Sequence, residues 1–126
     1  MSLRTPLSRA LGLGSAGDGT AHWWQQRVTA VALVLLGLWF AFSLLGADLS
    51  DRAALVAWIG QPLTAALLVL LVLTAAWHSQ LGTRVIAEDY VHGAFKVPLL
   101  VALQFIHAIA AAVGVLAVLQ IAIGGR

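Results

Sequence analysis

The sequence predicts an all-α membrane protein with three transmembrane helices. Of its 126 residues, 61% are hydrophobic and only 10% are charged, whereas about a quarter of the residues of a soluble domain carry charge. Uncharged apolar runs of transmembrane length recur along the chain, separated by short polar segments. The absence of cysteine excludes disulfides, thiolate metal sites and thiol catalysis. The net charge of +2 is too small to favour nucleic acid as a partner.

The first predicted span covers residues 28–47, which carry no charge and would form a helix about 30 Å long. Residues 1–21 contain two arginines among four glycines and one proline, which predicts a basic N-terminal arm. Residues 22–126 are predicted to form the membrane-anchor domain. Between the arm and the first span, Trp23 and Trp24 are expected at the level of the lipid headgroups.

The second span is predicted over residues 62–84, closed by its terminal arginine. The uncharged run that contains it is too long for one crossing, and Pro62 suits the first turn of a helix. Residues 53–59 are therefore expected to lie at the membrane interface, with Ser50 or Asp51 as a helix N-cap.

The third span is predicted over residues 98–123, beginning at Pro98 after a polar loop over 88–96. Small side chains along this span permit close helix contact. They are Ala108, Ala110, Ala111, Ala112, Gly114 and Ala117. Because three helices enclose little interior, we expect this chain to pack with a partner anchor subunit in a larger assembly.

The distribution of basic residues predicts the orientation. The residues before the first span, the end of the second span and the second loop carry five of them, and the first loop and the C-terminal tail carry two. The positive-inside rule therefore places the N-terminus and the second loop in the cytoplasm and the C-terminus outside. The two groups are Arg4, Arg9, Arg27, Arg84 and Lys96 on one side, and Arg52 and Arg126 on the other.

His78 is the main candidate for chemistry. It lies 16 residues after Pro62, which is about 24 Å along a helix, so it falls within the membrane near the predicted inner face. A histidine at that depth needs a partner or a ligand, and a neutral imidazole is a common axial ligand of haem iron. Gly82, one turn later, would let a flat macrocycle lie against the helix. The alternative is a histidine hydrogen-bonded to a neighbouring helix.

A second candidate pair follows the second span. The Tyr90 phenol is placed to hydrogen-bond a quinone carbonyl, and the adjacent Asp89 carboxylate to support proton delivery. An ordinary interfacial tyrosine is the competing interpretation. Arg27, at the start of the first span, is suited to pair with a haem propionate or with a lipid headgroup.

The remaining polar residues near the spans are assigned structural roles. His107 is interpreted as a helix-packing histidine, and His22 and His92 as solvated interfacial residues. Glu88 is expected at a solvated helix end, because neighbours on a helix point about 100° apart and do not form a catalytic pair with each other.

Four short segments together resemble a known family. They are His22-Trp23, Gln26-Arg27-Val28-Thr29-Ala30, His78-x-x-Leu81-Gly82 and Glu88-Asp89-Tyr90-Val91. This pattern resembles the smaller of the two hydrophobic membrane-anchor subunits of succinate dehydrogenase, respiratory complex II, in its alphaproteobacterial form.

The resemblance implies specific roles for the candidate residues. His78 would be one axial ligand of haem b, with the second histidine supplied by the partner anchor subunit. Asp89 and Tyr90 would border the ubiquinone site beside the iron–sulfur subunit. Arg27 would lie near the haem propionates. FAD and the iron–sulfur clusters would reside only in the partner subunits.

The expected function is therefore that of a non-catalytic membrane-anchor subunit of succinate:ubiquinone oxidoreductase in a bacterial inner membrane. It would help electrons from succinate to reach ubiquinone in the respiratory chain and tricarboxylic acid cycle. Two alternatives remain open: a purely structural anchor without a redox cofactor, and a small transporter subunit. A transporter is expected to have polar groups throughout its spans, whereas here they cluster at one end.

Overall fold

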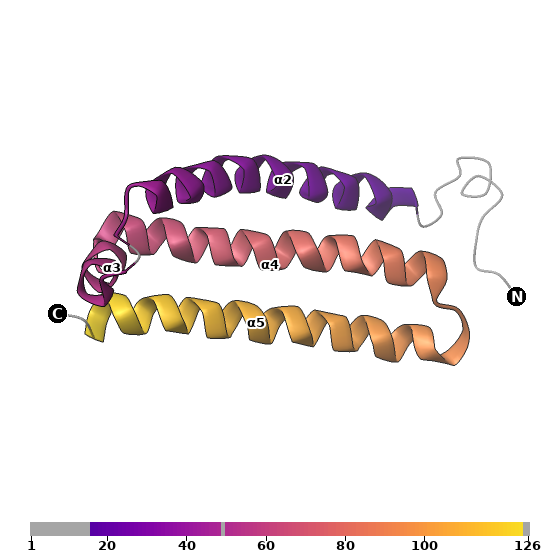
Figure 1. The fold of residues 1–126 in the computed structure, drawn as a ribbon. Helices are drawn as coiled ribbons and strands as arrows, with labels where there is room; N and C mark the ends of the chain where they lie inside the picture. Colours follow the sequence, from indigo (N-terminus) through magenta and orange to yellow (C-terminus); the bar gives the residue numbers. More distant parts are fainter. Residues whose placement is uncertain (1–15, 49, 125–126) are drawn as a thin grey trace, which may run out of the picture.

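Three long helices dominate the computed structural model, which describes residues 16–48 and 50–124. All three are long and apolar enough to cross a membrane, and the described residues contain no strand. This confirms the predicted all-α architecture with three spans. The elements, labelled as in Figure 1, are α2 (Ala16–Leu45), α3 (Arg52–Ile59), α4 (Pro62–Tyr90), the 3₁₀ turn η1 (Gly93–Phe95) and α5 (Lys96–Gly124).

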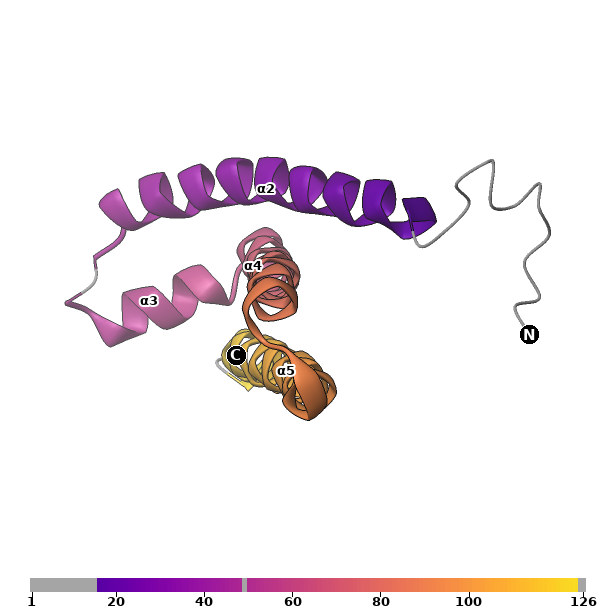
Figure 2. The same cartoon turned by 90° about the vertical axis from the view of Figure 1, so that its right-hand side faces the viewer.

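Helix α4 lies in the middle of the arrangement. α4 and α5 run antiparallel side by side, whereas α2 crosses α4 obliquely (Figures 1 and 2). In the described part of the chain, α2 and α5 each pack on α4 but not on each other. The fold of this part is therefore open. Among its three long helices, only α4 packs against both of the others.

The interior of this arrangement is small. Among the described residues, the buried side chains are Thr29, Thr64, Ala65, Leu68, Leu81, Ala87 and Ala122. Many large apolar side chains on all three long helices are exposed instead. An apolar exterior of this extent suits contact with lipid or with another subunit.

Helix α2 begins earlier than predicted, at Ala16 instead of Val28. Residues 16–21 of the predicted arm thus belong to the helix, and residues 1–15 lie outside the described residues. Trp23 and Arg27 are one helical turn apart on α2, and the guanidinium carbon of Arg27 lies 5.5 Å from the centre of the Trp23 ring.

The short helix α3 begins after one of the two N-cap residues predicted from the sequence. The Asp51 carboxylate accepts a hydrogen bond of 2.8 Å from the Ala53 backbone N–H, so Asp51 is the N-cap. Ser50 instead donates from its hydroxyl and its backbone N–H to Asp48, and these bonds hold the pKa of the Asp48 carboxyl below its usual value. The ring of Trp58 stacks on that of Trp39 in α2, with the ring centres 6.4 Å apart.

Helix α4 begins at Pro62 as predicted, but it does not end at Arg84. It continues for six more residues to Tyr90, so Glu88, Asp89 and Tyr90 are helical and do not belong to a loop. The Arg84 guanidinium donates to the Glu88 carboxylate at 2.8 Å, an i,i+4 pair that favours the helix.

A tight turn then leads to α5. The Lys96 ammonium donates to the Glu88 backbone oxygen at 3.0 Å, which satisfies a carbonyl in the last turn of α4. Gly93 has a φ of +75°, a conformation that glycine adopts without steric cost. α5 starts at Lys96, two residues before the predicted Pro98.

Helices α4 and α5 approach closely at a glycine. A Cβ atom built on Gly114 would lie 2.7 Å from Val72 Cγ1 of α4, which is too short for a real contact. The glycine is therefore required for this close approach, and the prediction that small residues of the third span permit helix contact is confirmed at this position.

Candidate functional site

The side chain of His78 lies at the crossing of α2 and α4. It is half-buried, and its Nδ1 is 2.9 Å from the Thr29 hydroxyl oxygen on α2. Its other nitrogen, Nε2, has the side-chain nitrogen of Gln26 as its polar neighbour, at 3.5 Å. The two ring nitrogens thus differ, since one is in a short hydrogen bond and the other has only a distant contact.

Thr29 is one of the two buried polar residues in the described chain, with 8% of its surface exposed. Its hydroxyl donates to the backbone oxygen of Gln25 at 2.8 Å, and the oxygen of Gln26 is a longer alternative at 3.2 Å. A threonine hydroxyl in a helix commonly bonds back to the preceding turn in this way. The His78 ring therefore meets a hydroxyl group that is already anchored to its own helix.

Gln26 fills the space beside His78. A Cβ atom on Gly82, one turn after His78, would lie 3.7 Å from the Gln26 side-chain nitrogen. The surface that Gly82 leaves open is thus covered by Gln26 of α2. The Gln26 side-chain oxygen is itself buried and has no hydrogen-bond partner among the described residues.

His107 has a complete set of partners elsewhere. Its Nδ1 is 2.7 Å from the Leu103 backbone oxygen, and its Nε2 is 3.1 Å from the Ser79 hydroxyl on α4. Because a carbonyl only accepts, Nδ1 carries the proton and Nε2 accepts from Ser79. This histidine links α5 to α4, in agreement with the helix-packing role predicted for it.

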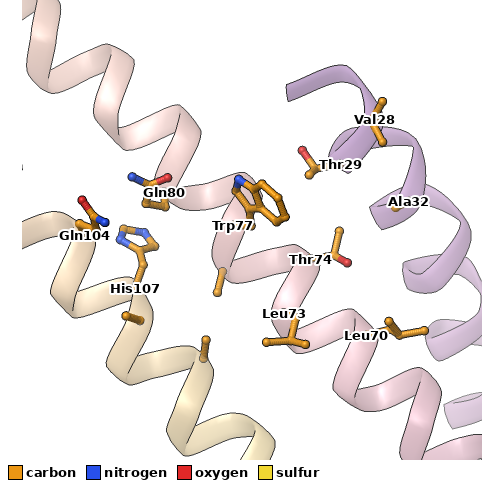
Figure 3. A pocket seen from close by; sticks show the side chains of 13 residues that line it. Val28, Thr29, Ala32, Leu70, Leu73, Thr74, Trp77, Gln80, Gln104 and His107 are labelled. Atoms are coloured by element: carbon orange, nitrogen blue, oxygen red, sulfur yellow. The ribbon is translucent and has the colours of Figure 1, made fainter. Parts of the chain in front are cut away.

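An apolar groove of about 660 Å³, here called the central groove, lies between the three long helices (Figure 3). Trp77 of α4 lies in its middle, with Thr29 of α2 on one side and His107 of α5 on the other. Its remaining polar lining consists of Thr74, Gln80 and Gln104. Apart from these groups the groove offers an apolar surface.

A second hollow of about 540 Å³ is polar, and lies beside α2, α4 and α5 toward the Tyr90 end of α4. The Arg84–Glu88 ion pair forms part of its wall. Nε2 of His22 is buried and without a partner among the described residues. The other polar lining residues are Gln25, Gln80 and Gln104.

The structure does not bring Tyr90 to either hollow. Tyr90 is 81% exposed at the end of α4, and its neighbour Asp89 is exposed as well. Arg27 lies on α2, where its guanidinium packs on Trp23. Of the predicted site residues, only His78 and Gly82 therefore lie at the crossing of α2 and α4, one turn apart on α4, whereas Asp89 and Tyr90 are neighbours at the end of that helix.

Within the described ranges, no group of three histidine, cysteine or acidic side chains is arranged to hold a metal ion. The half-buried imidazole at the helix crossing is His78, whose Nε2 has only the 3.5 Å contact with Gln26.

Sequence comparisons identify the family of the chain. The sequence model of the family described as the succinate dehydrogenase/fumarate reductase transmembrane subunit matches residues 1–120. The chain belongs to this family.

Two relatives show which subunit of the family the chain is similar to. The succinate dehydrogenase hydrophobic membrane anchor subunit of Rickettsia bellii is 35% identical over 88 residues, covering 70% of this chain and 70% of the relative. The protein of the same name from Paracoccus denitrificans is 38% identical over 89 residues, covering 71% and 69%. No solved structure matches the chain significantly. Three apolar spans and these relatives together identify a membrane anchor of the succinate dehydrogenase family.

Two residues at the crossing of α2 and α4 were not predicted from the sequence to be site residues. Thr29 and Gln26 surround His78, yet neither has a side chain that predicts a cofactor site by itself. One signal was present: Thr29 is one of only two hydroxyl-bearing residues within the apolar span 28–47. Its partner on another helix is determined by the angle at which α2 crosses α4, which local sequence does not encode.

Proposed function

We propose that this chain is a membrane-anchor subunit of succinate:quinone oxidoreductase that supplies one axial haem ligand and part of the quinone site. The observation that supports the proposal is how the two ring nitrogens of His78 are hydrogen-bonded. A half-buried imidazole in a membrane helix is held through Nδ1, while Nε2 has no partner closer than 3.5 Å among the described residues. A haem ligand needs a free nitrogen of this kind.

The surroundings of His78 fit a haem group. The chain supplies one neutral imidazole and a glycine one turn away, and it lacks, in the described ranges, the ligand cluster that a non-haem metal would need. Haem b, when bound, supplies one-electron redox chemistry. His78 would hold the iron through Nε2, and the Gln26 carboxamide would move aside from that nitrogen. The second histidine would come from a partner anchor subunit.

Arg27 is proposed to pair with a haem propionate. Its guanidinium lies on the face of Trp23, and the ion pair found among the side chains that the structure describes is Arg84–Glu88, which does not involve it. It is therefore available to an anionic group from outside the chain.

Tyr90 and Asp89 are proposed to border the quinone site. Both lie at the end of α4 and are exposed, so a neighbouring iron–sulfur subunit has access to them. The phenol would donate a hydrogen bond to a quinone oxygen, and the carboxylate would pass a proton from the aqueous side. Ubiquinone is the substrate that the resemblance implies.

The exposed apolar surface supports an assembly with other subunits. Few side chains of the three long helices are buried, and α2 and α5 each have a free flank in the described part of the chain. We propose that part of this surface is covered by a second anchor subunit, and that the iron–sulfur and flavoprotein subunits dock at the Tyr90 end. The excess of basic residues at that end favours its placement on the cytoplasmic side of a bacterial inner membrane.

A purely structural anchor is the second candidate function, and one observation favours it. His78 is already hydrogen-bonded to Thr29 of a neighbouring helix, which would satisfy one nitrogen without any cofactor. The haem-binding anchor and the structural anchor differ in whether Nε2 of His78 binds haem iron.

A difference spectrum of the purified complex tests the proposal. We expect a b-type haem band in the reduced-minus-oxidised spectrum of the wild type, and its loss or shift in His78→Ala. His107→Ala is the matched control, because this histidine is on the neighbouring helix with both nitrogens bonded, and it should retain the band. A haem band unchanged by His78→Ala would contradict the haem part of the proposal.

A further inference from the structure

The hydrogen bond between Thr29 and His78 has a direction that the neighbouring groups determine. A threonine hydroxyl has one hydrogen, and that of Thr29 lies against the Gln25 backbone oxygen at 2.8 Å. With its hydrogen committed there, the oxygen is left as an acceptor toward His78. The proton of the neutral imidazole then resides on Nδ1, which is 2.9 Å away, and Nε2 keeps a free electron pair.

We propose that Thr29 is a positioning residue, which holds His78 in the tautomer that binds iron. The inference rests on the proposed role of His78 as a haem ligand. Histidines that bind metals through one nitrogen usually donate the other N–H to a fixed acceptor, and this outer bond orients the ring and strengthens it as an electron donor. Thr29 provides such an acceptor from a different helix.

The opposite tautomer also has an acceptor close by, which explains why the hydroxyl is needed. The Gln26 side-chain oxygen is buried and unpartnered among the described residues, and its amide group lies 3.5 Å from Nε2 of His78. If the imidazole proton moved to Nε2, rotation of the amide would bring that oxygen against it. Nε2 would then be blocked as a ligand. The Thr29 oxygen opposes this by holding the proton at Nδ1.

Burial makes the contact strong enough to matter. Thr29 is only 8% exposed, and water does not compete effectively for a hydrogen bond at such a site. The bond also joins α2 to α4 at their crossing, so it sets the rotation of the ring relative to both helices.

The test uses three variants of the assembled complex. Thr29→Val removes the hydroxyl at nearly constant volume, and Thr29→Ser retains it. Thr83→Val is the matched control, because the Thr83 hydroxyl makes the same kind of bond to its own helix, to the backbone oxygens of Ser79 and Gln80, with no histidine as its partner. The measurements are the haem content, the haem midpoint potential and the electron paramagnetic resonance signal of the ferric haem.

We expect Thr29→Val to weaken haem retention by about ten- to hundredfold, as is typical when an outer partner of a ligand is lost. The midpoint potential should rise, because a histidine without its outer acceptor donates less electron density and stabilises ferric iron less. Thr29→Ser should restore both values, and Thr83→Val should match the wild type.

Wild-type haem content, potential and resonance signal in Thr29→Val would overturn the inference, as would an equal change in Thr83→Val. The underlying proposal is judged separately by His78→Ala. If His78→Ala abolishes the haem band while Thr29→Val changes nothing, His78 is the ligand and Thr29 does not position it. If His78→Ala leaves the band intact, both assignments fail.

Discussion

His78 and Tyr90 lie twelve residues apart on one uninterrupted helix, α4. At the usual rise this separates them by about 18 Å along the helix axis. No loop or hinge intervenes, since the helix continues through Arg84 and Glu88, which are paired to each other. The proposed haem ligand and the proposed quinone-binding phenol are therefore held at a constant separation by a single rigid element.

Tyr90→Phe is expected to lower quinone reduction by about tenfold or more, because one hydrogen bond to a developing negative charge contributes about 1.5–3 kcal/mol. Succinate oxidation with a soluble dye should be unaffected, and steady-state kinetics with both acceptors measures the difference. Phe95→Leu is the control: Phe95 is exposed in the adjoining turn and has no hydroxyl. Equal quinone kinetics in the wild type and Tyr90→Phe would rule out the proposed role.

Gly114→Ala is expected to destabilise the α4–α5 pair by about 1–3 kcal/mol, the usual cost of overpacking. The added methyl would meet Val72 at 2.7 Å, and a valine in a helix has little rotamer freedom with which to move away. Thermal unfolding in detergent measures the effect.

Gly37→Ala is the control for that substitution, since nothing lies within 4 Å of a Cβ atom at Gly37 of α2, and no loss of stability is expected there. Val72→Ala should recover part of the stability when combined with Gly114→Ala, because the two sites are in contact. Additive losses in the double variant would argue against the close approach.

The Ser79–His107 hydrogen bond is expected to couple α4 and α5 modestly. In membrane proteins such bonds contribute about 0.6 kcal/mol on average and up to about 1.7 kcal/mol. A double-mutant cycle with Ser79→Ala and His107→Phe measures this coupling. A coupling near zero would mean that the 3.1 Å contact does not stabilise the pair.

Asp51→Ala is expected to cost about 1 kcal/mol, because it removes the acceptor for the Ala53 N–H at the start of α3. Asp51→Asn should retain most of the stability, since asparagine is an equally good N-cap. Denaturation of the complex in detergent compares the two. If both substitutions cost the same, the charge of Asp51 and not its capping bond would be the relevant property.

Local sequence signals were sufficient for much of the fold. Pro62 marked the start of α4 correctly because proline is favoured in the first turn, and Asp51 was one of two caps considered. Arg84 was misleading as a helix end. An arginine suits the end of an apolar run, but it does not break a helix, and a partner four residues later extends the helix to Tyr90.

The environment of His78 could not be predicted from the sequence. Its position in the membrane follows from counting residues after Pro62, and both a ligand role and a bonded role were open on that basis. The contact with Thr29 depends on how α2 crosses α4. The surroundings of Gly82 also could not be read from the sequence. The prediction was that its missing side chain lets a flat macrocycle lie against α4, but in the structure the side chain of Gln26 lies beside it.

The oblique crossing of α2 also bears on how the anchor matches its bilayer. The candidate membrane span of α2, Thr20–Leu45, has 26 residues, which is about 39 Å of helix. Its first two turns carry His22, Gln25, Gln26 and Arg27, and the uncharged part that follows has to match a hydrocarbon core about 30 Å thick. A tilted helix covers a smaller thickness than its length, and changing the tilt is an inexpensive response to a thicker or thinner membrane. Because α2 touches α4 but not α5 in the described part of the chain, a change in its tilt would alter its contact with α4, including the Thr29–His78 bond, and would leave the α4–α5 contact in place.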